Sequence, residues 1–302
     1  MLQTADRLQP RVRFEYAGDT TKDILCSAHP FTMHGMLPLK ILVVPFFLAL
    51  ITLAARRWGP GVGGLLAGFP VVTGPILYFL AIEQGSAFAA MAAKGSLLAV
   101  VACVGFGIVF SLSALRFSWE SSLLLGWTGW LVIAGAFAVV PVPLPLFACV
   151  TLAILAVWLG RRVVPVQRGV APAGSALPRS ELLARMVAGA LLVRIVTTIA
   201  SVVGTQWAGL MAMFPVLGSV LGVFSLRRNG PLYVAQLFRG MFLGFISFAT
   251  FCTTVSLLLR EFSPAQAFGL SALTTILVQG IVYWAATQAL VFRDANDSHG
   301  RN

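Results

Sequence analysis

The chain has 302 residues, of which 58% are hydrophobic and only 10% are charged, with a mean hydropathy of +0.90. A soluble globular domain carries about 25% charged residues, so this chain has too few charges to cover a water-facing surface. The composition excludes a soluble enzyme, a disordered protein and a water-soluble helical bundle, and it predicts a polytopic membrane protein. The net charge of +11 comes from basic residues that lie between apolar runs rather than in one cluster. No nucleic-acid partner is therefore predicted.

A helix needs about 20 apolar residues to cross the hydrocarbon core, and the chain holds about nine such runs. They cover residues 39–55, 61–82, 95–115, 121–140, 144–160, 183–204, 207–226, 240–259 and 266–291. The predicted fold class is therefore all-α, a polytopic membrane protein with about nine transmembrane helices. Residues 1–35 and 293–302 are expected to be polar tails. The first tail is either disordered or the product of a misassigned start codon, with Met33 or Met36 as the true start; we favour the second interpretation.

The two halves of the chain match each other without a gap. Residues 64–71 (GLLAGFPV) align with residues 209–216 (GLMAMFPV), and the same register pairs Gly85 with Gly230 and Lys94 with Arg239. We predict repeat one at 36–142, a linker helix and cytoplasmic loop at 143–180, and repeat two at 181–292. Each repeat has four spans and one span separates them, so repeat two enters the membrane from the opposite side. Inverted repeats of this kind are a common plan of secondary transporters.

Lys and Arg residues concentrate in the loops after the odd-numbered spans. These residues are Arg56, Arg57, Arg116, Arg161, Arg162, Arg168, Arg179, Arg227 and Arg228. The positive-inside rule predicts that these loops and the C-terminus are cytoplasmic and that the N-terminus lies outside.

A short motif in each half resembles a known family. The pattern Ala-Gly-Leu-x-x-x-Phe-Pro at 208–215, followed by Arg227-Arg228-Asn229-Gly230 and Arg239, is similar to the small GlpM-like inner-membrane proteins of bacteria. Repeat one departs from the pattern, because Glu83-Gln84 stands where the basic pair would fall. The resemblance implies a bacterial inner membrane and a link to envelope polysaccharide production. It implies no established biochemical activity.

The Phe-Pro pairs are the symmetric candidates for a site. Pro70 and Pro215 lack an N–H group and clash with the preceding turn, so each is expected to break its span. Freed carbonyls at membrane depth are tolerated where they are buried in protein or line a cavity. The candidate substrate path comprises Phe69, Pro70, Thr73, Gln206, Phe214, Pro215, Ser219 and Gln279. The alternative is a packing kink between small residues.

Arg194 is the charged residue predicted to lie deepest in a span. It follows Arg185 by nine residues, which places it roughly 13 Å further along the helix. It is expected either to contact an anionic substrate or headgroup in a cavity, or to extend along its stem to an interface. Glu83, Lys94 and Arg239 are candidates for gates or interface anchors, with Lys94 and Arg239 at the starts of equivalent spans.

The remaining polar residues predict no catalytic chemistry. All three histidines lie in the tails, and no Asp or Glu falls near the middle of a span. We therefore expect no enzyme, no metal and no cofactor. The expected function is transport or flipping of a small polar or anionic envelope metabolite by alternating access. The alternative is a non-catalytic scaffold for envelope polysaccharide assembly. The expected partners are the lipid bilayer, an unknown small polar or anionic substrate and a second copy of the chain in a homo-oligomer.

Overall fold

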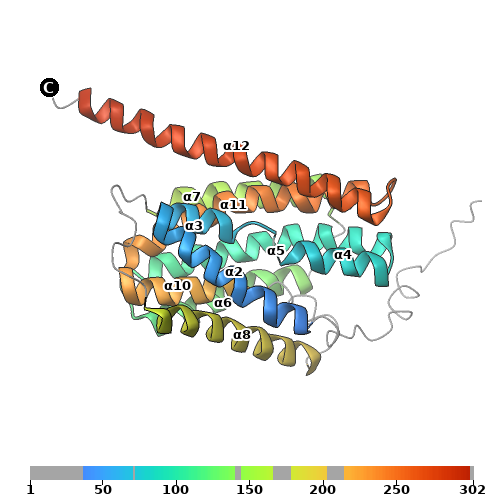
Figure 1. The fold of residues 1–302 in the computed structure, drawn as a ribbon, viewed down its shortest axis with the longest axis horizontal. Helices are drawn as coiled ribbons and strands as arrows, with labels where there is room; N and C mark the ends of the chain where they lie inside the picture. Colours follow the sequence, from blue (N-terminus) through green and yellow to red (C-terminus); the bar gives the residue numbers. More distant parts are fainter. Residues whose placement is uncertain (1–36, 71, 140–143, 166–177, 203–213, 300–302) are drawn as a thin grey trace, which may run out of the picture. The chain divides into compact units, whose positions relative to one another are not determined.

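A computed structural model describes residues 37–70, 72–139, 144–165, 178–202 and 214–299, and all regular structure in these ranges is helical. Figure 1 shows the helices in chain order. They are α2 (Leu37–Trp58), α3 (Pro60–Ala67), α4 (Thr73–Glu83), α5 (Ser86–Ser113), α6 (Trp119–Val139), α7 (Leu146–Val163), α8 (Arg179–Val202), α10 (Val216–Asn229), α11 (Pro231–Leu258) and α12 (Pro264–His299). They belong to one compact unit, Met33–Asn302.

Within the described ranges, six helices are long and apolar enough to cross a membrane: α5, α6, α7, α8, α11 and α12. The described residues are therefore all-helical, as predicted, and the six helices support the prediction of a polytopic membrane protein. The expected N-terminal tail, a possible start at Met36, and Gln206 lie outside the described residues.

The second predicted span is broken at the expected place. Helix α3 ends at Ala67 and α4 begins at Thr73, with Phe69 and Pro70 outside both helices. The Phe69 amide donates to the Leu66 carbonyl at 3.2 Å instead of to Leu65. The break is local, because the Gly74 amide already donates to the Pro70 carbonyl at 2.9 Å.

Two helices begin several residues before the apolar runs predicted at 95–115 and 240–259. Helix α5 begins at Ser86 and α11 at Pro231, so Lys94 and Arg239 lie within helices rather than at their first residues. Gly85 and Gly230 set these boundaries, since both adopt positive φ (92° and 83°), which glycine tolerates without steric strain. Hydropathy finds only the part of a helix that is apolar, and here the helices extend further.

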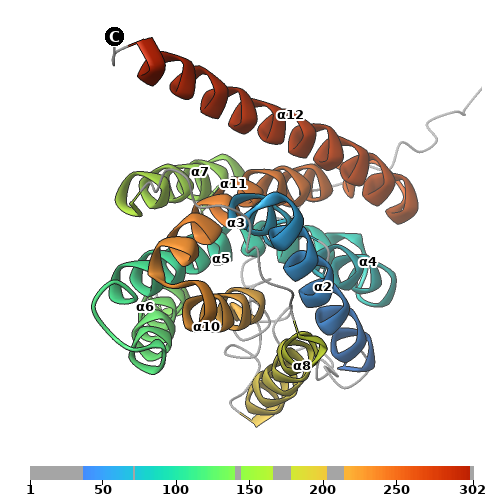
Figure 2. The same ribbon diagram turned by 60° about the vertical axis from the view of Figure 1, so that its left-hand side comes forward.

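Helices α3 and α11 approach each other through glycines, and Figure 2 shows them side by side. A Cβ atom at Gly64 would overlap the Leu237 carbonyl oxygen, and one at Gly244 would lie 2.8 Å from the Gly68 Cα. Small residues allow the backbones of membrane helices to touch in this way. The contact holds the C-terminal end of α3, and therefore the break, against the centre of α11.

The other helices surround this pair. Helix α5 packs on α6, α7 and α11, while α12 packs on α11 and α4, and α2 packs on α3 and α8. Phe106, Phe110, Phe238 and Phe242 are fully buried where α5 meets α11, with Phe106 and Phe238 ring centroids 5.8 Å apart. The rings form the core of the described bundle.

Candidate functional site

A cavity of about 180 Å³ lies where the two Phe-Pro segments meet. The first Phe-Pro segment and the start of α4 contribute Phe69 and Thr73, and the second segment contributes Phe214 and Pro215. The remaining walls come from α2, α4, α5, α8, α10 and α11 and from the end of α3. Four of the predicted path residues therefore share one cavity although they lie far apart in the sequence.

The cavity wall is mainly apolar. Its polar side chains are the hydroxyls of Thr73, Ser96 and Thr197 and the thiol of Cys103, and the Ser96 hydroxyl donates to the Ala92 carbonyl at 3.0 Å. Among the described residues no Asp, Glu, Lys, Arg or His lines it. Helices α4 and α10 begin at this wall, so the positive ends of two helix dipoles lie beside the cavity.

Two tryptophans of α6 support the second Phe-Pro segment. The Trp127 and Trp130 rings lie 5.5 and 5.2 Å from the Phe214 ring. The Trp127 indole N–H donates to the Ser219 hydroxyl at 2.9 Å, and that hydroxyl donates to the Pro215 carbonyl at 2.8 Å. Ser219 therefore stabilises the cavity wall through these two hydrogen bonds and does not line the cavity itself.

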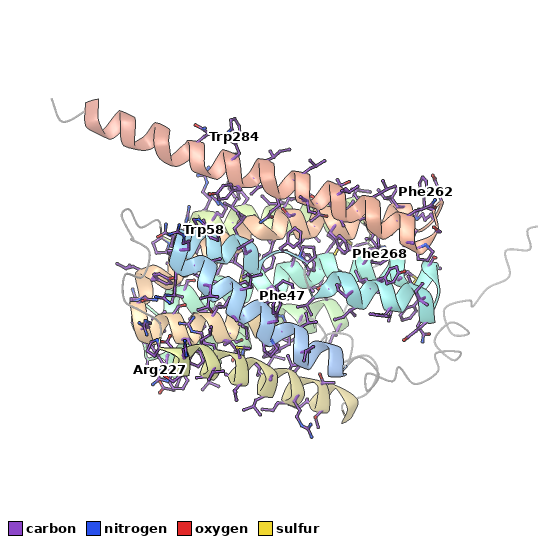
Figure 3. The ribbon with its side chains drawn as sticks, viewed as in Figure 1. Phe47, Trp58, Arg227, Phe262, Phe268 and Trp284 are labelled. Carbon is purple, nitrogen blue, oxygen red and sulfur yellow. The ribbon has the colours of Figure 1, made fainter. Side chains whose placement is uncertain are left out.

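The first Phe-Pro segment borders a groove instead. A space of about 380 Å³ is lined by residues that include Pro70, Gly74, Ala272 and Thr275. In the register of the sequence match, Ala272 and Thr275 correspond to Trp127 and Trp130. Large side chains thus fill the space beside Phe214, whereas small ones leave it open beside Pro70. Nearer the start of α12, Phe268 points toward α4 and α11, where its ring meets Tyr78 and Phe251 (Figure 3).

Gln279 donates a hydrogen bond to a carbonyl group that the helix break leaves without its usual helical partner. Its side-chain amide donates to the Leu65 carbonyl at 3.2 Å, the acceptor that the Phe69 amide leaves when it turns to Leu66. A polar residue of α12 thus satisfies a backbone group freed at membrane depth, as burial in protein requires. Gln279 lies behind the cavity wall rather than in it.

The structure does not bring Arg194 to the cavity. Val193, Val196 and Thr197 line the cavity from α8, whereas Arg194 is exposed on a different face of that helix. This placement favours the second of the two expectations for Arg194, a side chain that extends along the helix surface.

The gate candidates do not form a pair. Glu83 is exposed and Lys94 half-buried, and no ion pair joins these two described residues. Arg239 donates to the carbonyls of Arg161 and, at 2.6 Å, Val164. It thereby caps the C-terminal end of α7.

A second cluster, which sequence reasoning missed as a site, lies between the ends of four helices. The residues Thr52, Arg56, Arg185, Arg228 and Tyr233 line a small pocket. We call it the arginine pocket. From the sequence, Arg56 and Arg228 are interpreted only as topology signals, and Arg185 is used only to place Arg194. The one sequence hint is Glu181, which stands one helical turn before Arg185.

Comparison with protein-family models, curated proteins and solved structures finds no match. Within the described ranges, no group of His, Cys, Asp and Glu could hold a metal ion.

Proposed function

We propose that this chain is a membrane transporter or flippase-like protein that moves a small polar or anionic envelope metabolite by alternating access. The observation that carries the proposal is the cavity at the two Phe-Pro segments. Transporter sites are typically built where interrupted helices end near the bilayer midplane. A kink that served only packing between small residues would not require such a space.

The proposal includes two inverted repeats and about nine spans. In the register of the sequence match, α5 and α11 begin and end at equivalent residues, Ser86–Ser113 and Pro231–Leu258. The packing is reciprocal as well, because α6 contacts α5 and α10 while α12 contacts α11 and α4. These observations support a pseudo-two-fold exchange of the halves, which is the basis of alternating access in inverted-repeat transporters.

The chemistry of the cavity wall restricts the class of substrate that we propose. The N-termini of α4 and α10 favour a negative group, and the three hydroxyls offer hydrogen bonds. The apolar walls favour a ligand that also carries a hydrocarbon part. We infer a small amphipathic anion rather than a fully polar one.

The proposed orientation places the C-terminus in the cytoplasm of a bacterial cell, with this chain in the inner membrane. Arg56, Arg185 and Arg228 come from three helices and line one pocket, so three basic helix ends share one face of the bundle. Trp58 and Arg227 lie at this end and Phe262 at the other (Figure 3). This grouping supports the positive-inside assignment.

Thiol labelling tests the proposal without knowledge of the substrate. Thr73→Cys is introduced into the full chain lacking Cys26, Cys103, Cys149 and Cys252, and is treated with a membrane-impermeant reagent in right-side-out and inverted vesicles. A transporter exposes position 73 to each side in turn, so both preparations are labelled. Thr151→Cys, on the outer surface of α7, is the matched control and stays unlabelled in both.

Labelling of position 73 from neither side, or from one side only, contradicts alternating access. That result favours the scaffold for polysaccharide assembly, since a scaffold needs no water path through its centre.

A further inference from the structure

The arginine pocket lies between the C-terminal turns of α2 and α10 and the N-terminal turns of α8 and α11. Arg185 is 4% exposed and stacks on Phe224, with its guanidinium carbon 5.4 Å from the ring centroid. Its terminal nitrogen donates to one Glu181 carboxylate oxygen at 2.7 Å, and Arg228 donates to the other oxygen. One carboxylate is thus shared by two guanidinium groups.

Two further donors in the pocket have no acceptor. The Arg185 Nε and the Thr52 hydroxyl are buried without a hydrogen-bond partner, and Thr52 is only 3% exposed. A buried donor without an acceptor destabilises the folded state, because it has lost its hydrogen bonds to water. These two unsatisfied donors indicate that the pocket binds a group with hydrogen-bond acceptors. Guanidinium groups arranged in this way match the oxygens of phosphate.

In this conformation Glu181 occupies the place of such an acceptor. The free volume is about 10 Å³, which suffices for one water molecule and not for a phosphate group. A phosphate group must therefore displace the Glu181 carboxylate from Arg185 and Arg228. Glu181 acts in this scheme as an internal competitor for the site.

The pocket also adjoins the central cavity. Leu221 and Leu237 line the pocket and are each 2% exposed, while Leu217 and Met241 line the cavity. Each pair of positions is four residues apart on α10 or α11, so about 6 Å of helix separates the two spaces. The side chains of Leu221 and Leu237 therefore separate the arginine pocket from the central cavity.

We propose that the arginine pocket binds a phosphate-class anion at the proposed cytoplasmic end of the molecule, as the entry site to the cavity. The role as an entry site rests on the proposed function, whereas anion binding does not. A soluble phosphate compound and a phospholipid headgroup present the same chemistry, and the experiment separates them.

The test measures thermal unfolding of the full chain in nanodiscs. A ligand that binds the folded state raises the Tm as its concentration exceeds the Kd. The probes are inorganic phosphate in discs of phosphatidylcholine, and phosphatidylglycerol added to the discs without phosphate. Stabilisation by phosphate supports a soluble source, and stabilisation by phosphatidylglycerol alone supports a headgroup. Stabilisation by neither overturns the proposal.

Variants assign the effect to the pocket. Arg185→Gln is expected to abolish the stabilisation, whereas Arg227→Gln leaves it unchanged, because Arg227 is exposed beside the Trp119 ring. Glu181→Gln removes the competitor, so half-saturation is expected at about tenfold lower phosphate or lipid concentration. If Arg185→Gln does not fold, the Glu181→Gln result decides alone. An unchanged or weaker response of Glu181→Gln, or equal responses of the two arginine variants, overturns the proposal.

The result is independent of the transport test. Anion binding by a chain whose position 73 stays unlabelled would leave the pocket standing and remove its entry role. Labelling from both sides without any anion response would do the reverse.

Discussion

The contact between α3 and α11 predicts a sharp difference between two glycines of one helix. A Cβ atom at Gly64 would lie 2.7 Å from the Met241 amide nitrogen, besides overlapping the Leu237 carbonyl, whereas ordinary contacts begin at 3.4 Å. Both neighbours are backbone atoms, which no side-chain rotation can relieve. A Cβ atom at Gly61, one turn earlier on α3, meets nothing within 4 Å.

The expected energies follow from these contacts. Overpacking of a tight interface costs typically about 1–3 kcal/mol, and it outweighs the roughly 0.5–1 kcal/mol that alanine gains over glycine in a helix. Gly64→Ala should therefore lower the Tm by several degrees, at roughly 2–4 °C per kcal/mol. Gly61→Ala should leave the Tm unchanged or raise it slightly.

Thermal unfolding of both variants in the same detergent measures the difference. Equal Tm values for the two variants, or a more stable Gly64→Ala, would refute the close approach of α3 and α11. The position of the helix break would then lose its support.

Three further predictions concern the asymmetry, the charge on α8 and the topology. Trp130 is 1% exposed and packs against Phe214, so Trp130→Ala should lower the free energy of unfolding by about 3–5 kcal/mol. Ala272→Trp should fold with an unchanged or higher Tm, because the groove beside Pro70 receives the ring. A large fall in Tm for Ala272→Trp argues against the groove. Arg194→Leu should insert and fold as well as the original chain, and loss of thiol labelling at position 73 in that variant would show a role in the cavity. Reporter fusions after Arg57 and Arg228 should report cytoplasm and one after Gln84 periplasm; the same side for Gln84 and Arg228 would contradict inverted repeats.

The helix break and its place in a cavity could be predicted from the sequence. Proline lacks an N–H group and interrupts a helix whatever surrounds it. Pro70 therefore identified the end of α3 without knowledge of the neighbouring helices. The match between residues 64–71 and 209–216 then indicated that Phe69 and Phe214 would share an environment, and both line the cavity.

The direction of individual side chains could not be predicted in the same way. The face of α8 that turns inward depends on its packing against α2, where a Cβ atom at Gly189 would overlap Leu48. Hydropathy ranks the residues of a span by polarity and so selected Arg194, which is exposed. Gln279 was predicted as a residue of the substrate path, and its acceptor could not be foreseen, because the Leu65 carbonyl becomes free only through the break itself.

The arginine pocket could not be predicted, because the positive-inside rule already accounts for basic residues at these helix ends. Lys and Arg at helix ends are expected from the positive-inside rule alone, so Arg56, Arg185 and Arg228 carried no separate signal. Only the packing of α2, α8 and α10 around one space distinguishes them from Arg227, which is exposed.

Alternating access is tested most directly by distances between spin labels on opposite ends of the bundle. One pair, Arg57→Cys with Arg227→Cys, spans the end of the arginine pocket, and a second, Leu42→Cys with Ile199→Cys, spans the other end of α2 and α8; all four positions are exposed. In the chain lacking native cysteines, reconstituted in lipid, each pair should show two distance populations. A condition that favours the longer distance at one end should favour the shorter one at the other. A single narrow distribution for both pairs, unchanged by pH, salt or phosphate, would contradict the account.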